Sequence, residues 1–182
     1  MIIMLGALQD WVWEIDSQNN ETCFMEDPFC KQGRIPQYSV MATSALHVQH
    51  AVRFAKTYNL RLVIRNTGHD GAGRSSAPDS LQVYTHHLKG IVHHRAFIPD
   101  GLSSSKGQAV TVGAGVMLGD LYKQGATGGY SIVGGECATV GAAGGFLLGG
   151  GLSPLAQTNG LAVDNILELE VVMANVSAFA IR

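Results

Sequence analysis

The sequence has no long apolar run, no cluster of basic residues and little charge overall. No stretch approaches the roughly 20 consecutive apolar residues that span a bilayer, so we expect no transmembrane helix and no membrane partner. Twelve Lys and Arg against 14 Asp and Glu give a formal net charge of −2, which argues against a nucleic-acid partner. Only 14% of the residues are charged and 46% are hydrophobic, so the 182 residues should fold as one globular domain or as a piece of a larger protein.

Cysteine is scarce as well, with three in the chain. Cys23 and Cys30 are close enough in sequence to close a small disulfide loop, and Asn20 begins an Asn-Glu-Thr glycosylation triplet. Both features are typical of a secreted protein. Residues 1–8 are apolar but lack a basic start, so they make a poor signal peptide. A chance triplet and two reduced thiols are the alternative interpretation.

Glycine, in contrast, is abundant and clustered. The chain has 23 glycines, of which eight lie between Gly134 and Gly151, while residues 43–60 contain none. Val, Ala, Phe and Leu are interleaved with the clustered glycines, which does not fit a flexible linker. The pattern indicates backbone that adopts positive φ or approaches a ligand closely.

Regular structure is expected to begin after an irregular arm, residues 1–33. A short strand over 35–40 is followed by a helix that Thr43 or Ser44 caps and that runs to Asn59, because Val48, Ala51, Val52 and Ala55 recur at helical spacing. A second strand over 60–64 completes a β-α-β unit. Such a unit predicts a parallel pair of strands.

The rest of the chain favours short strands separated by turns. We predict strands over 81–85, 109–112, 131–133 and 166–173, and one short helix over 117–124. The predicted fold class is therefore α+β, with an N-terminal β-α-β unit and a mostly antiparallel second sheet.

The loop after the second strand, Arg65-Asn-Thr-Gly-His-Asp-Gly-Ala-Gly-Arg-Ser-Ser76, can direct backbone N–H groups at one anion. This property is typical of loops that hold a pyrophosphate, and it predicts a dinucleotide. The segment from Gly134 to Gly151 can form the other wall of the same site. Neither segment alone is specific, because neither matches the phosphate-binding GxxxxGK[ST] motif or a Rossmann fingerprint.

Taken together, the two segments carry a resemblance. The order RNTGHDGAGRSSAPDS, AVTVGAGVMLGDLY and VGGECATVGAAGGFLLGGGLSPLAQTNGLAVDNILELEVV resembles the FAD-binding domain of berberine-bridge-enzyme-like flavin oxidases, within the vanillyl-alcohol-oxidase superfamily. The resemblance covers about residues 33–174. It implies a PCMH-type FAD-binding domain over 34–174, FAD as cofactor, and an oxidase that takes hydride from a small organic substrate such as a sugar, alcohol or secondary metabolite. Molecular oxygen would be the electron acceptor, and the protein would be secreted.

The resemblance also assigns two covalent bonds to the flavin. His69 matches the histidine bonded to the 8α-methyl carbon, and Cys137 matches the cysteine that some members bond to C6. Imidazole is a neutral nucleophile near pH 7, whereas a thiol needs neighbouring N–H groups or a positive partner to ionise. The alternatives are a histidine that only hydrogen-bonds a phosphate or backbone group, and a buried, inert cysteine.

The full set of predicted cofactor-binding residues comes from these motifs. It comprises Arg65, Asn66, Thr67, Gly68, His69, Asp70, Gly71, Arg74, Ser75, Ser76, Gly134, Gly135, Cys137, Thr139, Val140, Gly141, Gly144, Gly145, Gly149, Gly150, Gly151 and Val163. No catalytic base is assigned.

The chain departs from the family in two places. Leu152 stands where relatives often have histidine, and nothing after Arg182 corresponds to a substrate domain. Residues 175–182 look like an atypical tail, and we suspect a gene model that reads into an intron. A non-catalytic FAD-binding fragment is therefore the alternative function, and a flavin-free structural module is a weaker one.

The histidine pairs 86–87 and 93–94 are expected to be solvated strand ends. Adjacent residues on a strand point to opposite faces, so each pair offers one ligand to any single site. We expect no metal site.

Overall fold

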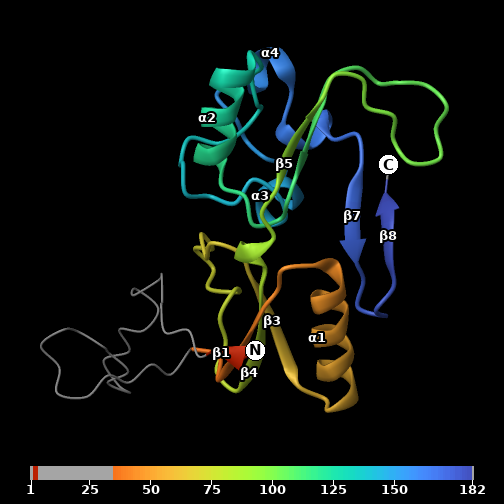
Figure 1. The fold of residues 1–182 in the computed structure, drawn as a ribbon. Helices are drawn as coiled ribbons and strands as arrows, with labels where there is room; N and C mark the ends of the chain where they lie inside the picture. Colours follow the sequence, from red (N-terminus) through yellow and green to blue (C-terminus); the bar gives the residue numbers. More distant parts are fainter. Residues whose placement is uncertain (1, 4–34, 182) are drawn as a thin grey trace, which may run out of the picture.

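The computed structural model describes residues 2–3 and 35–181, so the predicted disulfide, the glycosylation triplet and nearly all of the predicted arm lie outside the described residues. Figure 1 shows two halves, one above the other, and a hairpin beside them. No helix in the described residues is both long and apolar enough to cross a membrane.

The lower half is a four-stranded sheet with one helix. The sheet has the order β1-β2-β4-β3, in which β2 and β3 both run parallel to β4 and β1 runs antiparallel to β2. Helix α1 packs against it, and Ala42, Ala51 and Val83 form the buried centre. The elements are β1 (Ile2–Ile3), β2 (Tyr38–Met41), α1 (Ala45–Thr57), β3 (Arg61–Arg65) and β4 (Ser80–Tyr84).

The predicted β-α-β unit is present, but its two strands are not neighbours. Strand β4 lies between β2 and β3, so the predicted direct pair is wrong although all three strands are parallel. Four of the five β4 residues are buried, which suits the middle of a covered parallel sheet. The prediction failed because a crossover helix defines the direction of two strands but not what lies between them.

Helix α1 begins where its cap was predicted. The Ser44 hydroxyl accepts a hydrogen bond from the His47 N–H at 3.3 Å, which satisfies one free donor of the first turn. The predicted apolar stripe is confirmed, since Ala51 and Ala55 are buried. The helix ends at Thr57, two residues before the predicted end, and Asn59 then turns the chain with a φ of 51°.

The upper half combines a β-hairpin with one longer helix and several short helical turns. Its core contains Val116, Leu118, Leu121 and Ala142. The elements are β5 (Ile91–His94), β6 (Ala109–Val112), α2 (Leu118–Gly128), α3 (Gly145–Leu148), α4 (Ala156–Asn159) and η3 (Ala162–Asn165), with β5 antiparallel to β6. The short helix η2 (Thr85–His87) follows β4 and contacts β2 and β3 of the lower half.

Of the elements predicted in the upper half, one strand and the helix are present and one strand is not. The strand over 109–112 is confirmed, and the predicted helix runs on to Gly128. The strand predicted over 131–133 is wrong, because Ile132 packs onto the core around α2 instead of pairing with another strand.

The remaining element is an antiparallel hairpin of β7 (Leu169–Val172) and β8 (Ala178–Ile181). The predicted strand over 166–173 is therefore shorter than expected, and part of the sequence interpreted as an atypical tail forms β8. The Asn175 side chain accepts hydrogen bonds from the Ser177 N–H and hydroxyl, which closes the turn. Gln49 of α1 donates to the Val176 carbonyl at 2.9 Å and so ties the hairpin to the lower half.

Candidate functional site

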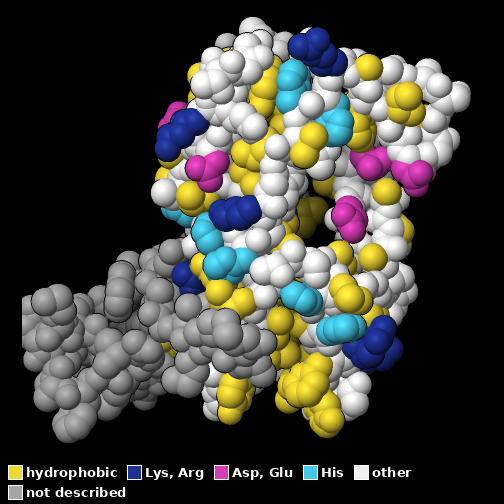
Figure 2. Space-filling view, viewed as in Figure 1, with side chains coloured by type: hydrophobic (Ala, Val, Ile, Leu, Met, Phe, Trp, Pro, Cys, Tyr) yellow, Lys and Arg dark blue, Asp and Glu magenta, His cyan; other side chains and the backbone are white. Residues whose placement is uncertain are grey.

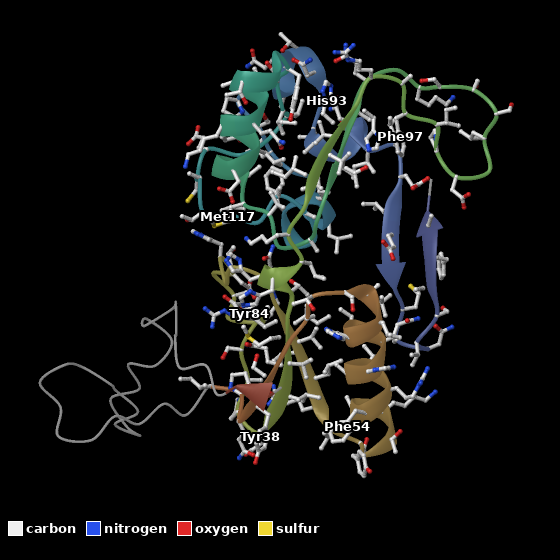
Figure 3. All side chains as sticks on the ribbon, viewed as in Figure 1. Tyr38, Phe54, Tyr84, His93, Phe97 and Met117 are labelled. Atoms are coloured by element: carbon white, nitrogen blue, oxygen red, sulfur yellow. The ribbon has the colours of Figure 1, made fainter. Side chains whose placement is uncertain are left out.

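The two glycine-rich segments meet where the halves of the molecule join. The first loop, residues 66–76, follows β3, and the second segment, residues 134–151, follows α2. In Figure 3, Tyr84 at the end of β4 and Met117 just before α2 mark the two sides of this boundary. A single bridge joins Met117 to Gly141 of the second segment.

Asp70 organises the first loop. Its carboxylate accepts hydrogen bonds from the N–H groups of Ala72 (3.3 Å), Arg74 (2.6 Å) and Ser75 (3.0 Å), and pairs with the Arg74 guanidinium at 3.0 Å. Burial alone would raise the pKa of this carboxyl, but the bonds from Arg74 and Ala72 outweigh it and lower the pKa. Three N–H groups of the loop that is predicted to hold a pyrophosphate thus converge on the protein's own carboxylate.

Gln82 connects this loop to the sheet. Its side chain is buried in β4, donates to the Ser75 carbonyl at 3.3 Å and accepts from the Ser39 hydroxyl at 3.0 Å. Sequence reasoning missed Gln82. A polar residue at a predicted buried strand position was the available signal, since such a side chain needs partners.

The second segment is held mainly by its backbone against the start of α2. The N–H groups of Leu118 and Gly119 donate to the carbonyls of Val140 (2.9 Å) and Ala138 (2.8 Å). The Ala142 N–H donates to the Val116 carbonyl at 2.9 Å. The turn that contains Cys137 is therefore fixed to a helix of the upper core.

Asn66 brings the two segments into direct contact. A Cβ on Gly141 would lie 1.9 Å from Asn66 Nδ2, so only glycine fits beside this side chain. The same amide donates to the Ala114 carbonyl at 2.7 Å. Asn66 Oδ1 is buried and has no hydrogen-bond partner within the described residues. The glycine at 141 is therefore required by a protein side chain, and close approach to a ligand at this position stays a prediction.

Three polar side chains from the two segments come together at this contact. His69 Nε2 lies 2.7 Å from the Thr139 hydroxyl and 4.0 Å from Cys137 Sγ, and the hydroxyl lies 3.4 Å from the same sulfur. His69 and Cys137 are 68 positions apart in the chain. All three residues are exposed.

Cys137 has the surroundings of a reactive thiol. The Thr139 hydroxyl and the N–H groups of Thr139 and Val140 lower its pKa, because hydrogen bonds to sulfur stabilise the thiolate. Its exposure does not fit a buried, inert cysteine.

The glycine triplet is placed against η3. Gly150 and Gly151 have φ of 95° and 71°, and a Cβ on Gly151 would lie 2.5 Å from that of Ala162. The Val163 N–H donates to the Gly150 carbonyl at 3.3 Å, so Val163 contacts the triplet. Leu148 and Leu152 beside it are 85% and 76% exposed.

Some of the other predicted site residues pack against protein side chains, and others border open space. Gly134 and Gly135 face Tyr122 and Leu118 of α2, which gives them a packing role, and Arg65 lies over the Tyr84 ring. A Cβ on Gly71 or Gly145 would meet no atom within 4 Å, so open space borders both. The remaining predicted site residues lie within the two segments and are Thr67, Gly68, Ser76, Gly144 and Gly149.

A hollow that sequence reasoning missed lies between α2 and the segment before β5. It has a volume of about 590 Å³ and is lined by Lys89, Asp120, Lys123 and Thr127, among others. On the face shown in Figure 2, the Lys and Arg side chains are scattered singly. Within residues 2–3 and 35–181, no group of three or more His, Cys, Asp or Glu side chains could hold a metal ion.

Comparison with known proteins identifies the family. The family described as "FAD binding domain" matches residues 36–179. The chain belongs to this family. Its cofactor is accordingly FAD, and the open space beside Gly71 and Gly145, the unpartnered Asn66 oxygen and the paired His69 and Cys137 fit such a group.

Two relatives of this chain are named FAD-linked oxidoreductases. It is 55% identical over 181 residues to the FAD-linked oxidoreductase easE of Arthroderma benhamiae, covering 95% of this chain and 36% of the relative. It is 54% identical to the FAD-linked oxidoreductase asqF of Emericella nidulans, covering 94% and 31%. The chain thus spans about a third of the length of these relatives.

Solved structures of flavoproteins have the same fold as this chain. The VAO-type flavoprotein MtVAO615 of Myceliophthora thermophila superimposes with a TM-score of 0.77 and 40% identity, over 83% of this chain and 27% of that one. The 6-hydroxy-D-nicotine oxidase of Arthrobacter nicotinovorans gives 0.71 and 26%, over 81% and 30%. The predicted α+β, VAO-type FAD-binding fold and the family resemblance are confirmed.

Proposed function

We propose that residues 34–174 form the FAD-binding domain of an oxygen-dependent oxidoreductase that takes hydride from a small organic substrate, with the flavin bonded to His69 and Cys137. FAD supplies the chemistry when bound, since it accepts the hydride and passes electrons to molecular oxygen. The substrate-binding part would lie in the remaining length of the protein, because the chain spans 36% of a 55% identical relative.

The contact between His69 and Cys137 is the observation that supports two covalent attachments to the flavin. Their nitrogen and sulfur lie 4.0 Å apart although they come from different halves of the molecule. The 8α and C6 positions both lie at the dimethylbenzene end of the flavin ring system, so two nucleophiles must be close together to reach them. The contact between the His69 ring, at Nε2, and the Cys137 sulfur brings the two side chains close enough together to meet that requirement.

The chain's own residues would orient the ring and hold the two nucleophiles at one edge. His69 and Cys137 would hold the flavin at its 8α carbon and at C6. Each attachment would exchange one C–H bond of the flavin and one N–H or S–H bond of the side chain for the new bond, and molecular oxygen would accept the two protons and two electrons as hydrogen peroxide. The lowered pKa of Cys137 supports its part, because the thiolate is the reactive form.

Acid precipitation tests whether the flavin is covalently attached at both His69 and Cys137. The flavin-loaded protein should give a yellow pellet, and a tryptic digest should contain the His69 and Cys137 peptides joined through one FAD. His69→Ala and Cys137→Ala should each keep the colour, and the double variant should lose it. Thr127→Ala on α2 is the matched control and should behave as the parent. A colourless parent pellet, from protein that binds FAD in its native state, would exclude covalent attachment.

The alternative is a non-catalytic FAD-binding chain, which the coverage of about a third of each relative favours. Anaerobic addition of sugars, alcohols or amines separates the two proposals. Bleaching of the bound flavin in the protein translated from the complete transcript, but not in the 182-residue chain, would assign the activity to the longer protein.

We also propose that the protein is secreted, with Cys23 joined to Cys30. Non-reducing mass spectrometry should find these two peptides linked. Two free thiols at these positions would remove the main support for secretion.

A further inference from the structure

The Thr139 hydroxyl is the shared partner of both proposed attachment residues. It lies 2.7 Å from His69 Nε2 and 3.4 Å from Cys137 Sγ. A hydroxyl carries one hydrogen to donate and two lone pairs that accept. Thr139 can therefore donate to the imidazole or to the sulfur, but not to both at once.

The ionisation state of Cys137 decides whether the Thr139 hydroxyl donates its hydrogen to the imidazole or to the sulfur. A thiolate has no hydrogen and can only accept, so the Thr139 hydroxyl then donates its hydrogen to the sulfur. The same oxygen can only accept from His69, which must carry its proton on Nε2. In the neutral imidazole this leaves the lone pair on Nδ1.

We propose that Thr139 is a positioning residue that couples the thiolate form of Cys137 to the Nε2–H tautomer of His69. The thiol proton leaves to solvent and no electrons move. One hydroxyl thereby prepares both nucleophiles, sulfur as an anion and imidazole with a free Nδ1. That the coupling prepares His69 and Cys137 for bonding to FAD rests on the proposed function. The coupling itself can be measured without the flavin.

The charged groups around the pair do not explain a thiolate by themselves. Glu136 precedes the cysteine, and Asp120 lies in the first turn of α2, against which this turn packs. Both are acidic and would oppose a negative sulfur. Asp70, next to His69, is already paired with Arg74. Hydrogen bonding, with Thr139 as its largest contributor, is the remaining stabilising influence, in agreement with the lowered pKa of Cys137.

Alkylation of the flavin-free 182-residue chain by iodoacetamide tests this coupling. The rate is followed against pH by mass spectrometry of the Cys137 peptide, which separates it from Cys23 and Cys30. Thr139→Val removes the hydroxyl at nearly constant volume, and should slow alkylation about three- to tenfold at neutral pH and move the profile to higher pH, as expected for one lost hydrogen bond. Thr139→Ser keeps the hydroxyl and should retain the parent profile, as should the control Thr127→Val.

Nitrogen-15 NMR of the histidines supplies the second measurement. Above the midpoint of the alkylation profile, His69 should be in the Nε2–H form in the parent and in Thr139→Ser, and should become a mixture of tautomers in Thr139→Val. Identical profiles for the parent and Thr139→Val, or an Nδ1–H imidazole beside the thiolate, would overturn the proposal. Failure of the parent to bond FAD would instead count against the proposed function, because neither measurement uses the cofactor.

Discussion

The first loop is held largely by side chains, whereas the second segment is held by its backbone. In the first loop, the Asp70 carboxylate gathers three N–H groups and the Arg74 guanidinium. In the second segment, carbonyls of the Cys137 turn accept from the first N–H groups of α2. Glycine thus has two uses in one site. In the first loop, glycine allows the backbone to fold around the Asp70 carboxylate. In the second segment, glycine allows the backbone to pack closely against other residues of the same chain, such as Asn66.

This difference predicts which substitutions each segment tolerates. A segment held by backbone should fail when a side chain enters a close contact. A loop held by one carboxylate should fail when that charge is removed, by mutation or by acid. The predictions below run from the largest expected effect to the smallest.

Gly141→Val should be the most damaging change. Its Cβ would overlap the Asn66 amide, which would have to give up its hydrogen bond to Ala114. Overpacking of this kind costs about 3 kcal/mol or more, so we expect a large fall in the free energy of unfolding and loss of FAD retention. Denaturant titration and flavin fluorescence after gel filtration measure both. Gly145→Val is the control for the stability measurement alone, because a Cβ there meets no protein atom within 4 Å, and equal stability of the two variants would contradict the comparison.

Asp70→Asn should loosen the first loop and cost about 2 kcal/mol, because the N–H groups lose a charged acceptor. The pKa of Asp70 is lowered on folding, so its ionised form stabilises the fold at pH values above the ordinary 3.8. That stabilisation is lost as the pH falls through the lower pKa of the folded chain.

Thermal unfolding of the two proteins from neutral to acidic pH tests this effect. The stability gap between the parent and Asp70→Asn should be widest near neutral pH and should narrow in acid. A gap that stays constant across this range would show that the Asp70 charge does not hold the loop.

Gly144→Ala should have a smaller effect confined to the second segment. Gly144 has φ of 62° and ψ of −121°, a region that residues with a Cβ rarely adopt, although open space surrounds it. Backbone strain of this kind costs about 1–2 kcal/mol. Denaturant unfolding measures the cost, and Ala143→Gly is a neighbouring control for backbone entropy. No loss of stability in Gly144→Ala would mean that this backbone geometry is not required.

Gly145→Ala and Gly71→Ala should change stability least, within about 0.5 kcal/mol, because a Cβ at either position meets no protein atom within 4 Å. If the open space belongs to FAD, the same substitutions should still weaken its retention. Equilibrium dialysis of FAD against each variant decides this. Unchanged affinity in both variants would place the cofactor elsewhere.

Local patterns allowed much of this structure to be predicted. Ser44 as a cap, the Ala51 and Ala55 stripe and the strand over 109–112 follow from spacing and capping chemistry, which act over a few residues. The two glycine-rich segments also carried the family resemblance, because close backbone contacts tolerate few other residues.

The tertiary structure alone decided which groups meet. The position of β4 between β2 and β3 and the failure of residues 131–133 to pair both depend on contacts distant in sequence. Asp70, which is predicted to bind the cofactor, also accepts hydrogen bonds from N–H groups of its own loop, and the residue pattern did not indicate this role. The Thr139 hydroxyl joins His69 to Cys137 across 68 positions. Spacing along the chain cannot predict such a contact, because it forms only when the two halves pack together.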